Sequence, residues 1–180
     1  MFDSKDSLRI HSKEVRKKLD INQISSRMLS VLKKWNFYED SKVVMLYYPI
    51  NTEYNFLDLL NDSSKTYLFP KMSNGDIDVI EYNQNLGFKI GDYGIKEPVG
   101  LKFENYSQID LIITPALCAS KDGFRIGYGK GCYDRFFNLV ATTKTIVPIH
   151  SSLLYEHIPA EKHDIPVNFI LTEESIISCD

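Results

Sequence analysis

Residues 4–34 carry apolar side chains at helical spacing. Leu8, Val15 and Leu19 fall on one stripe, with polar residues between them. This pattern predicts a helical region in two pieces that are separated near Asp20. Two further segments are expected to be helical: 53–61 and 131–140.

Runs of β-branched and aromatic residues predict strands between these helices. The expected strands lie at 43–48, 66–71, 76–82, 111–117, 145–149 and, as the last strand, 168–172. Pro49 ends the first strand, and Ser73-Asn74-Gly75 is a turn signal between the second and the third. Residues 83–107 contain several glycine and proline breakers and are expected to be irregular. Strands that alternate with helices are typical of an α/β fold with a mostly parallel sheet.

Composition and charge restrict the partners. At 180 residues the chain is expected to form one domain, spanning 1–180. A net charge of -3 argues against nucleic-acid binding through a broad basic surface. No apolar run approaches the ~20 residues of a membrane span, and Met1 to Lys18 lacks a signal-peptide core. The odd number of widely spaced cysteines predicts neither a disulfide frame nor a zinc site. We therefore expect a cytoplasmic protein without nucleic-acid or membrane partners.

Segment 122–135 is the most distinctive part of the chain. It holds four of the nine glycines, with Arg125 and Lys130 between them and Asp134 after them. Glycine lets the backbone approach a ligand, so several amides can converge on one anion. The cations favour phosphate, and Asp134 could hold the accompanying magnesium. The alternative is a mobile surface turn. The segment matches neither the dinucleotide G-x-G-x-x-G nor a Walker A loop, which needs Ser or Thr where this chain has Gly131.

Other polar residues have two interpretations each. The cations of the first helix share one narrow band: Lys5, Arg9, Lys13 and Arg16. This band is either a solvated face or a second contributor to a phosphate pocket. Glu53 follows a predicted strand and is either a helix-dipole partner or part of a ligand site. His163-Asp164 is either a surface turn or the source of a second acidic group for magnesium.

Together these residues resemble the 5-formyltetrahydrofolate cyclo-ligase family, also called methenyltetrahydrofolate synthetases, over nearly the whole chain. The pieces occur in the family's order: Lys5-x-x-Leu8-Arg9, Tyr48-x-x-x-x-Glu53, Phe69-Pro70-Lys71, Tyr93-Gly94-Ile95-Lys96-Glu97-Pro98, Asp110-Leu111-Ile112-Ile113-Thr114-Pro115, the glycine block 123–134 and His163-Asp164. The glycine block is highly specific, and the other pieces are individually weak but collinear.

The resemblance implies a magnesium- and ATP-dependent ligase that converts 5-formyltetrahydrofolate to 5,10-methenyltetrahydrofolate and releases ADP and phosphate through an iminium phosphate intermediate. It also implies a three-layer α/β sandwich with a mostly parallel, partly mixed sheet of Rossmann-like topology. The implied partners are ATP and the folate, with or without a polyglutamate tail. A monomer is expected.

Residue roles follow from the same resemblance. Lys130 and Arg125 would be catalytic, because they neutralise developing charge. Glu53 would hold the pterin, and Tyr93 would line the folate site. Asp134 and Asp164 would serve magnesium. The residues implied to bind ATP are Lys5, Arg9, Arg125, Ile126, Gly127, Tyr128, Gly129, Lys130, Gly131, Cys132 and Tyr133.

The chain departs from the family pattern at two positions. Family members usually carry an aromatic residue where this chain has Cys132, which affects local packing or stacking rather than the phosphate amides. They commonly carry a second acid where this chain has Asn168, which leaves Asp164 as the better metal candidate. The alternative function is a folate- or nucleotide-binding protein that retains the fold without turnover. The combination of Arg125, Lys130 and Asp134 favours the enzyme.

Overall fold

The computed structural model describes residues 4–91 and 94–179 of the chain. In this part, the α-helices are α1 (Lys5–Arg16), α2 (Ile21–Lys33), α3 (Asn36–Asp40) and α4 (Cys132–Leu139). The strands are β1 (Val43–Met45), β2 (Thr66–Ser73), β3 (Asp76–Glu81), β4 (Phe88–Ile90), β5 (Lys96–Pro98), β6 (Leu111–Ile113), β7 (Cys118–Ser120), β8 (Arg125–Ile126), β9 (Lys144–Pro148), β10 (Leu154–Tyr155), β11 (Phe169–Leu171) and β12 (Ile176–Ser178). Short 3-10 helices are η1 (Leu57–Asn61), η2 (Tyr106–Gln108) and η3 (Ser151–Leu153).

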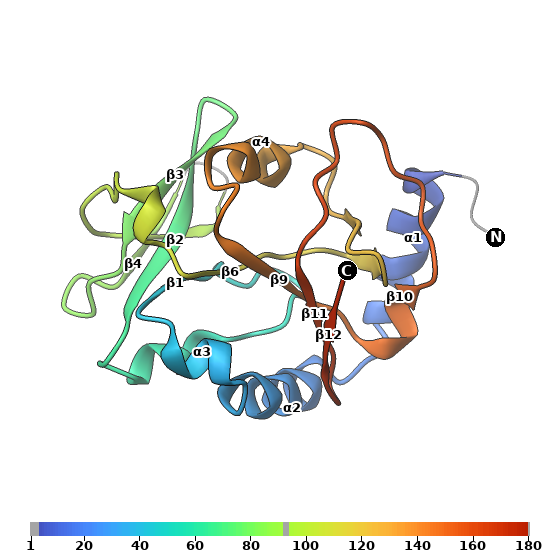
Figure 1. Cartoon of the computed structure of the whole chain (residues 1–180), viewed down its shortest axis with the longest axis horizontal. Helices are drawn as coiled ribbons and strands as arrows, with labels where there is room; N and C mark the ends of the chain where they lie inside the picture. Colours follow the sequence, from blue (N-terminus) through green and yellow to red (C-terminus); the bar gives the residue numbers. More distant parts are fainter. Residues whose placement is uncertain (1–3, 92–93, 180) are drawn as a thin grey trace.

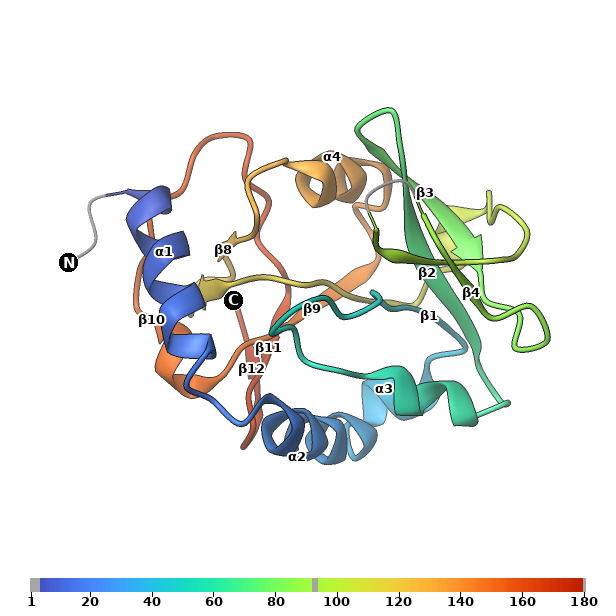
Figure 2. The same ribbon diagram turned by 180° about the vertical axis from the view of Figure 1, so that it is seen from behind.

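A seven-stranded sheet runs through the middle of the molecule in the order β12-β11-β9-β6-β1-β2-β3 (Figure 1). Its five inner strands are parallel, and the two edge strands β3 and β12 are antiparallel to their neighbours. Helices α2 and α3 lie on one face, while α1 and α4 lie on the other, as both views show (Figures 1 and 2). The predicted three-layer α/β fold with a mostly parallel, partly mixed sheet is confirmed.

Each face of the sheet has its own hydrophobic core. Successive residues of a strand point to opposite faces. Accordingly, Val44 and Leu111 join the cluster beneath α2, whereas Met45 and Ile112 join the cluster beneath α4. Because both faces are covered, the inner strands are continuous apolar runs rather than alternating ones.

The predicted break near Asp20 is confirmed and has a capping origin. Asp20 is the N-cap of α2, and its carboxylate accepts a hydrogen bond from the backbone amide of Gln23 at 3.0 Å. An N-cap side chain satisfies an amide that has no partner within the helix. The second helix begins where the sequence supplies this cap, after the first helix has ended at Arg16.

The predicted β-hairpin is also confirmed. Strands β2 and β3 pair antiparallel, with Ser73 opposite Asp76, so that the connection has two residues. Asn74 and Gly75 both have positive φ, 50° and 90°. Two-residue hairpins favour this conformation because its twist matches that of the strands.

Several predicted boundaries are wrong. The segment 53–61 is helical only as η1, because Glu53 is buried and closes a turn with Ile50 instead of starting a helix. The strand predicted at 111–117 ends at Ile113. The strand predicted to be last is followed by β12, and the region 83–107 contains the β4–β5 hairpin. Strands of three residues are too short to produce a recognisable period.

The strand order creates a topological switch point at β1, where the chain changes the direction in which it adds strands to the sheet. The chain leaves β1 towards β2 on one side and later returns as β6 on the other. Ligands of α/β sheets bind beyond the carboxyl ends of strands at such a switch point. A separate small sheet, β10-β7-β8, carries the glycine-rich segment to this position. Within the described ranges, none of the helices combines the length and apolar character needed to cross a bilayer.

Candidate functional site

A cavity of about 890 Å³ lies beyond the carboxyl ends of β1 and β6. Tyr47, Tyr48 and Ile50 line it after β1, and Pro115 lines it after β6. The whole segment 125–134 forms one wall. The structure therefore brings together most of the predicted site residues, which come from both ends of the sequence. Tyr93 lies outside the described residues.

The glycine segment forms an open loop before α4. Gly129 and Gly131 have φ values of 94° and 63°, which disfavour residues with a Cβ atom. Gly131 is the N-cap of α4. The backbone amides of Gly127, Tyr128 and Gly129 donate no hydrogen bond to any residue that the structure describes. Amides in this state beside a helix N-terminus are suited to bind an anion.

Helix α1 supplies two cations to the same wall. The Arg9 Nε donates a hydrogen bond to the Gly127 carbonyl at 3.1 Å, and the guanidinium packs against Gly129, where an added Cβ would lie 3.3 Å from Cζ. Lys5 lines the cavity nearby. The basic band of the first helix is thus not wholly a solvated face, because these two residues border the cavity and Arg16 is buried.

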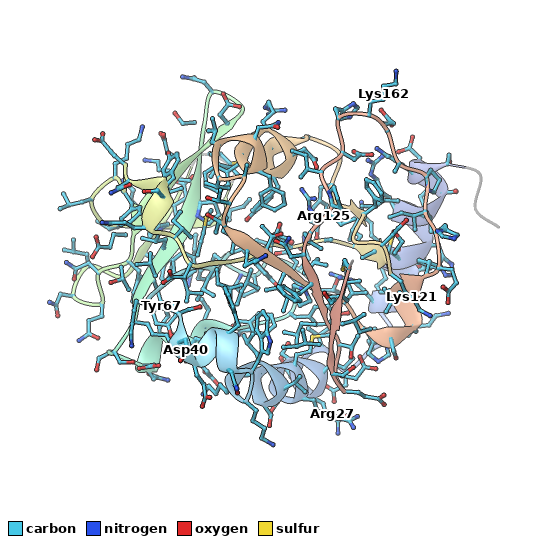
Figure 3. All side chains as sticks on the ribbon, in the orientation of Figure 1. Arg27, Asp40, Tyr67, Lys121, Arg125 and Lys162 are labelled. Carbon is cyan, nitrogen blue, oxygen red and sulfur yellow. The ribbon has the colours of Figure 1, made fainter. Side chains whose placement is uncertain are left out.

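Arg125 and Asp134 form an ion pair beneath the loop. The Arg125 Nη2 lies 3.1 Å from the Asp134 Oδ1, and its Nη1 donates to the Ile165 carbonyl at 2.6 Å. The guanidinium stacks 4.5 Å from the Phe137 ring centroid, and only 6% of the side chain is exposed. In Figure 3, Arg125 lies in the interior, whereas Arg27, Lys121 and Lys162 lie near the edge of the molecule. Lys130, in contrast, is exposed at the cavity wall.

A second acidic group faces α1. The Lys5 Nζ lies 2.6 Å from the Asp164 Oδ2 and 3.1 Å from the Glu161 Oε1. Burial would raise the pKa of Asp164, but the hydrogen bond and charge of Lys5 outweigh it and lower the pKa below its usual value. Asp164 is therefore a carboxylate at neutral pH. Glu161, which the sequence analysis did not identify, precedes the His163-Asp164 pair by two residues.

These carboxylates fit a magnesium ion that is bound mainly through phosphate oxygens. The Ile165 amide donates to the Asp134 Oδ1 at 3.1 Å, which places Asp134 beside the segment that contains Asp164. Within the described residues, no cluster of three or more His, Cys, Asp or Glu side chains is arranged to hold a metal alone. Magnesium commonly binds through one or two carboxylates together with substrate phosphates. Asp134 and Asp164 match that donor set.

Glu53 also lines the cavity and is 6% exposed. Its Oε2 accepts a hydrogen bond from the Ile50 amide at 2.9 Å. Burial raises the pKa of Glu53 to about 7, although the Ile50 hydrogen bond, the Arg16 charge and a hydrogen bond with Tyr128 oppose the rise. The Tyr133 hydroxyl is also buried there, without a hydrogen-bond partner among the described residues. Glu53 can therefore exchange a proton near neutral pH.

The remaining wall is partly apolar. Strands β2 and β3 contribute Pro70, Met72 and Ile77, and the β4–β5 hairpin contributes Lys96 and Glu97. These residues suit a flat organic ligand. The sequence analysis names Lys96 and Glu97 only as part of a family motif and gives them no role in the site. Their hairpin is far from the glycine loop in the sequence, so no sequence pattern indicates that both segments line the same cavity.

The two departures from the family pattern have different surroundings. Cys132 lines the cavity at the first turn of α4, with its Sγ 3.7 Å from the Lys130 carbonyl. Asn168 instead links two strands, because its Oδ1 accepts from the Thr145 amide at 2.9 Å. Its side chain is therefore occupied in the sheet.

Known proteins resemble this chain in both sequence and fold. A model of the 5-formyltetrahydrofolate cyclo-ligase family matches residues 3–173. The 5-formyltetrahydrofolate cyclo-ligase of Mycolicibacterium smegmatis is 36% identical over 84 residues, which make up 45% of this chain and 43% of that protein. The protein of the same name from Mycoplasma pneumoniae is 26% identical over 137 residues, 74% of each. The NMR structure of Aquifex aeolicus 5,10-methenyltetrahydrofolate synthetase has a TM-score of 0.87 and 29% identity, and the match covers 97% of this chain and 92% of that one. The first of these sequence alignments spans less than half of its relative.

Proposed function

Because the chain belongs to the 5-formyltetrahydrofolate cyclo-ligase family, we propose that it catalyses the ATP-dependent cyclisation of 5-formyltetrahydrofolate to 5,10-methenyltetrahydrofolate. The other products are ADP and phosphate. Folates with and without a polyglutamate tail are both proposed substrates. The protein is proposed to act as a monomer in the cytoplasm.

One observation carries the proposal: a single cavity combines two chemically different sets of lining residues. One set is the glycine-rich loop with the cations Lys5 and Arg9, and the other is Glu53 with the apolar side chains of β2 and β3. The volume of about 890 Å³ is at the upper end of the range for small-molecule sites. This arrangement suits a triphosphate that meets an organic substrate inside one enclosure.

The reaction needs positioning and charge neutralisation rather than a protein nucleophile. In the first step, the formyl oxygen forms a bond to the γ-phosphorus while the bond from that phosphorus to the bridging oxygen breaks. ADP leaves, and the formyl group becomes an iminium phosphate. In the second step, N10 bonds to the activated carbon and gives up its proton, and the carbon–oxygen bond breaks to release phosphate.

The residues that line the cavity have different roles in this scheme. Lys130 and the loop amides stabilise the charge that develops on the transferred phosphoryl group. Arg125 adds positive charge from below while it holds Asp134 in place. Glu53 accepts hydrogen bonds from the pterin, and Tyr93 lines the folate site.

Magnesium would be held by Asp134 and Asp164 and would neutralise phosphate charge. Both carboxylates face cations in this structure. A bound nucleotide would give Lys5 a phosphate partner, and Asp164 would then be available to hold the metal.

The test is to mix the protein with magnesium-ATP and 5-formyltetrahydrofolate and to follow methenyl absorbance together with ADP release. We expect product only when all components are present, with one ADP per methenyl group. Binding of the folate without product would instead support a binding protein that retains the fold without turnover.

A further inference from the structure

Arg16, at the C-terminal end of α1, contacts the chain on both sides of Glu53. Its Nη1 lies 3.5 Å from the carbonyl oxygen of Thr52, and its guanidinium lies 4.7 Å from the ring centroid of Tyr54. The Nη2 donates to the Ala116 carbonyl at 2.5 Å, directly after the cavity residue Pro115. One side chain thus joins the two segments that follow β1 and β6.

The guanidinium is buried, and no carboxylate of the described residues forms an ion pair with it. Arg16 is 1% exposed, its Nη1 and Nη2 face the carbonyl oxygens of Thr52 and Ala116, and its Nε has no hydrogen-bond partner among the described residues. An arginine stays charged in a protein, and a buried charge is costly unless an opposite charge compensates it. Glu53 is the carboxylate on which the Arg16 charge acts.

We propose that Arg16 is a positioning residue for Glu53: it holds the 52–54 segment against the cavity and brings its positive charge to the side of the cavity that holds Glu53. This inference rests on the proposed function only for the identity of the ligand. The contact between Arg16 and the 52–54 segment stands independently of it.

Within the part of the chain that the structure describes, Arg16 is the cation whose charge acts on Glu53. The groups that face it are the hydroxyls of Tyr47 after β1, Tyr128 in the glycine loop and Tyr133 in α4, together with the Ile50 amide. Burial and the Glu53 charge together raise the pKa of Tyr128 to about 12, so this hydroxyl is neutral at pH 7. Loss of the Arg16 charge therefore leaves burial less opposed, and the pKa of Glu53 must rise.

The first experiment is a carbon-13 NMR titration of the glutamate side-chain carboxyls, with the Glu53 resonance assigned through Glu53→Gln. In the wild type we expect a midpoint near 7. Arg16→Met should raise it by roughly one unit, a shift typical of losing a nearby opposite charge. Arg16→Lys keeps the charge and should shift it less. Lys17→Met is the matched control, because it removes an exposed positive charge that pairs with Glu14 and should move the midpoint little. An unchanged midpoint in Arg16→Met overturns the proposal.

The second experiment measures KM for the folate and for ATP. At pH 7, a shift of one unit leaves about a tenth of Glu53 ionised instead of half, so KM for the folate should rise about fivefold in Arg16→Met. Arg16→Lys, which is expected to fold, should raise the folate KM at least ~3-fold through its weaker hold on Thr52, with a smaller change for ATP. Both effects should disappear in a Glu53→Gln background. Equal changes for both substrates, or effects that persist without Glu53, would indicate a structural role and overturn the proposal. If the wild type forms no methenyl product, the proposed function fails, while the NMR titration still decides whether Arg16 acts on Glu53.

Discussion

Replacing Glu53 by glutamine should make the protein more stable at alkaline pH while it weakens folate binding. The pKa of Glu53 is about 7 in the folded protein, against 4.5 as its ordinary value. Between these values the folded state binds a proton that the unfolded state has released. The stabilising effect of this proton is fully present below pH 4.5 and is lost as the pH rises through 7.

The size of the effect follows from the pKa difference. Each unit corresponds to about 1.4 kcal/mol, and Glu53 is too buried for solvent to screen much of it. Between pH 5 and pH 8, linkage predicts a loss of roughly 2.5 kcal/mol in the free energy of unfolding. Glutamine cannot ionise, and its oxygen can still accept the hydrogen bond of the Ile50 amide. Glu53→Gln should therefore lack this loss.

Urea unfolding of both proteins at pH 5 and pH 8 measures the effect. The free-energy difference between variant and wild type should change by roughly 2.5 kcal/mol in favour of the variant between the two pH values. Glu173→Gln is a control without pH dependence in this range. Burial would raise the pKa of Glu173, but the hydrogen bonds from Ser151 help to lower it below 4.5, so Glu173 is ionised in both the folded and the unfolded protein from pH 5 to pH 8, and the cost of this substitution should change little between the two pH values. A difference for Glu53→Gln that does not depend on pH would refute a raised pKa at this position.

Three further predictions concern the glycine loop and its ion pair. Lys130→Ala should lower turnover at least ~10-fold, because stabilising a phosphoryl transition state is worth more than ~1.4 kcal/mol; wild-type rates would remove this lysine from the mechanism. Asp134→Asn should raise the magnesium concentration needed for half-maximal turnover, and an unchanged titration would argue against a metal role. Gly129→Ala should destabilise the fold by about 1–2 kcal/mol in urea unfolding, because its φ is 94° and the new Cβ would press on Arg9. Gly127→Ala, whose Cβ would meet nothing within 4 Å, should change stability by less than about 0.5 kcal/mol; equal losses in both would show that φ does not decide the effect.

Local features of the fold could be predicted from the sequence because their causes lie within a few residues. The hairpin turn at Asn74-Gly75 depends on the positive φ of those two residues. The break at Asp20 depends on one capping side chain. The inner strands lie in continuous apolar runs, which predict each of them, although the predicted strands at 43–48 and 111–117 are longer than β1 and β6. The short strands β7, β8 and β10 were not found, because they form only through pairing with distant segments.

The candidate site also has features that the sequence predicts and one that only the structure reveals. The glycine loop could be recognised because its backbone conformation and its charges are written in consecutive residues. Its resemblance to one family then suggested the roles of Lys5, Arg9 and Glu53. No sequence pattern indicated that Arg16, which belongs to the basic band of α1, is buried and contacts Thr52 and Ala116.

The sequence by itself determined the α/β class, the glycine-rich loop and the family, because periodicity, turn residues and motifs are local properties of the chain. Only the tertiary structure decided that the two ends of the chain meet in one cavity, that Asp134 and Asp164 face cations, and that Glu53 is buried enough to titrate near pH 7. A pKa and an ion pair depend on burial and on the distance between charges. Those quantities are fixed by packing between segments that the sequence separates by as many as 159 positions, as in the pair of Lys5 and Asp164.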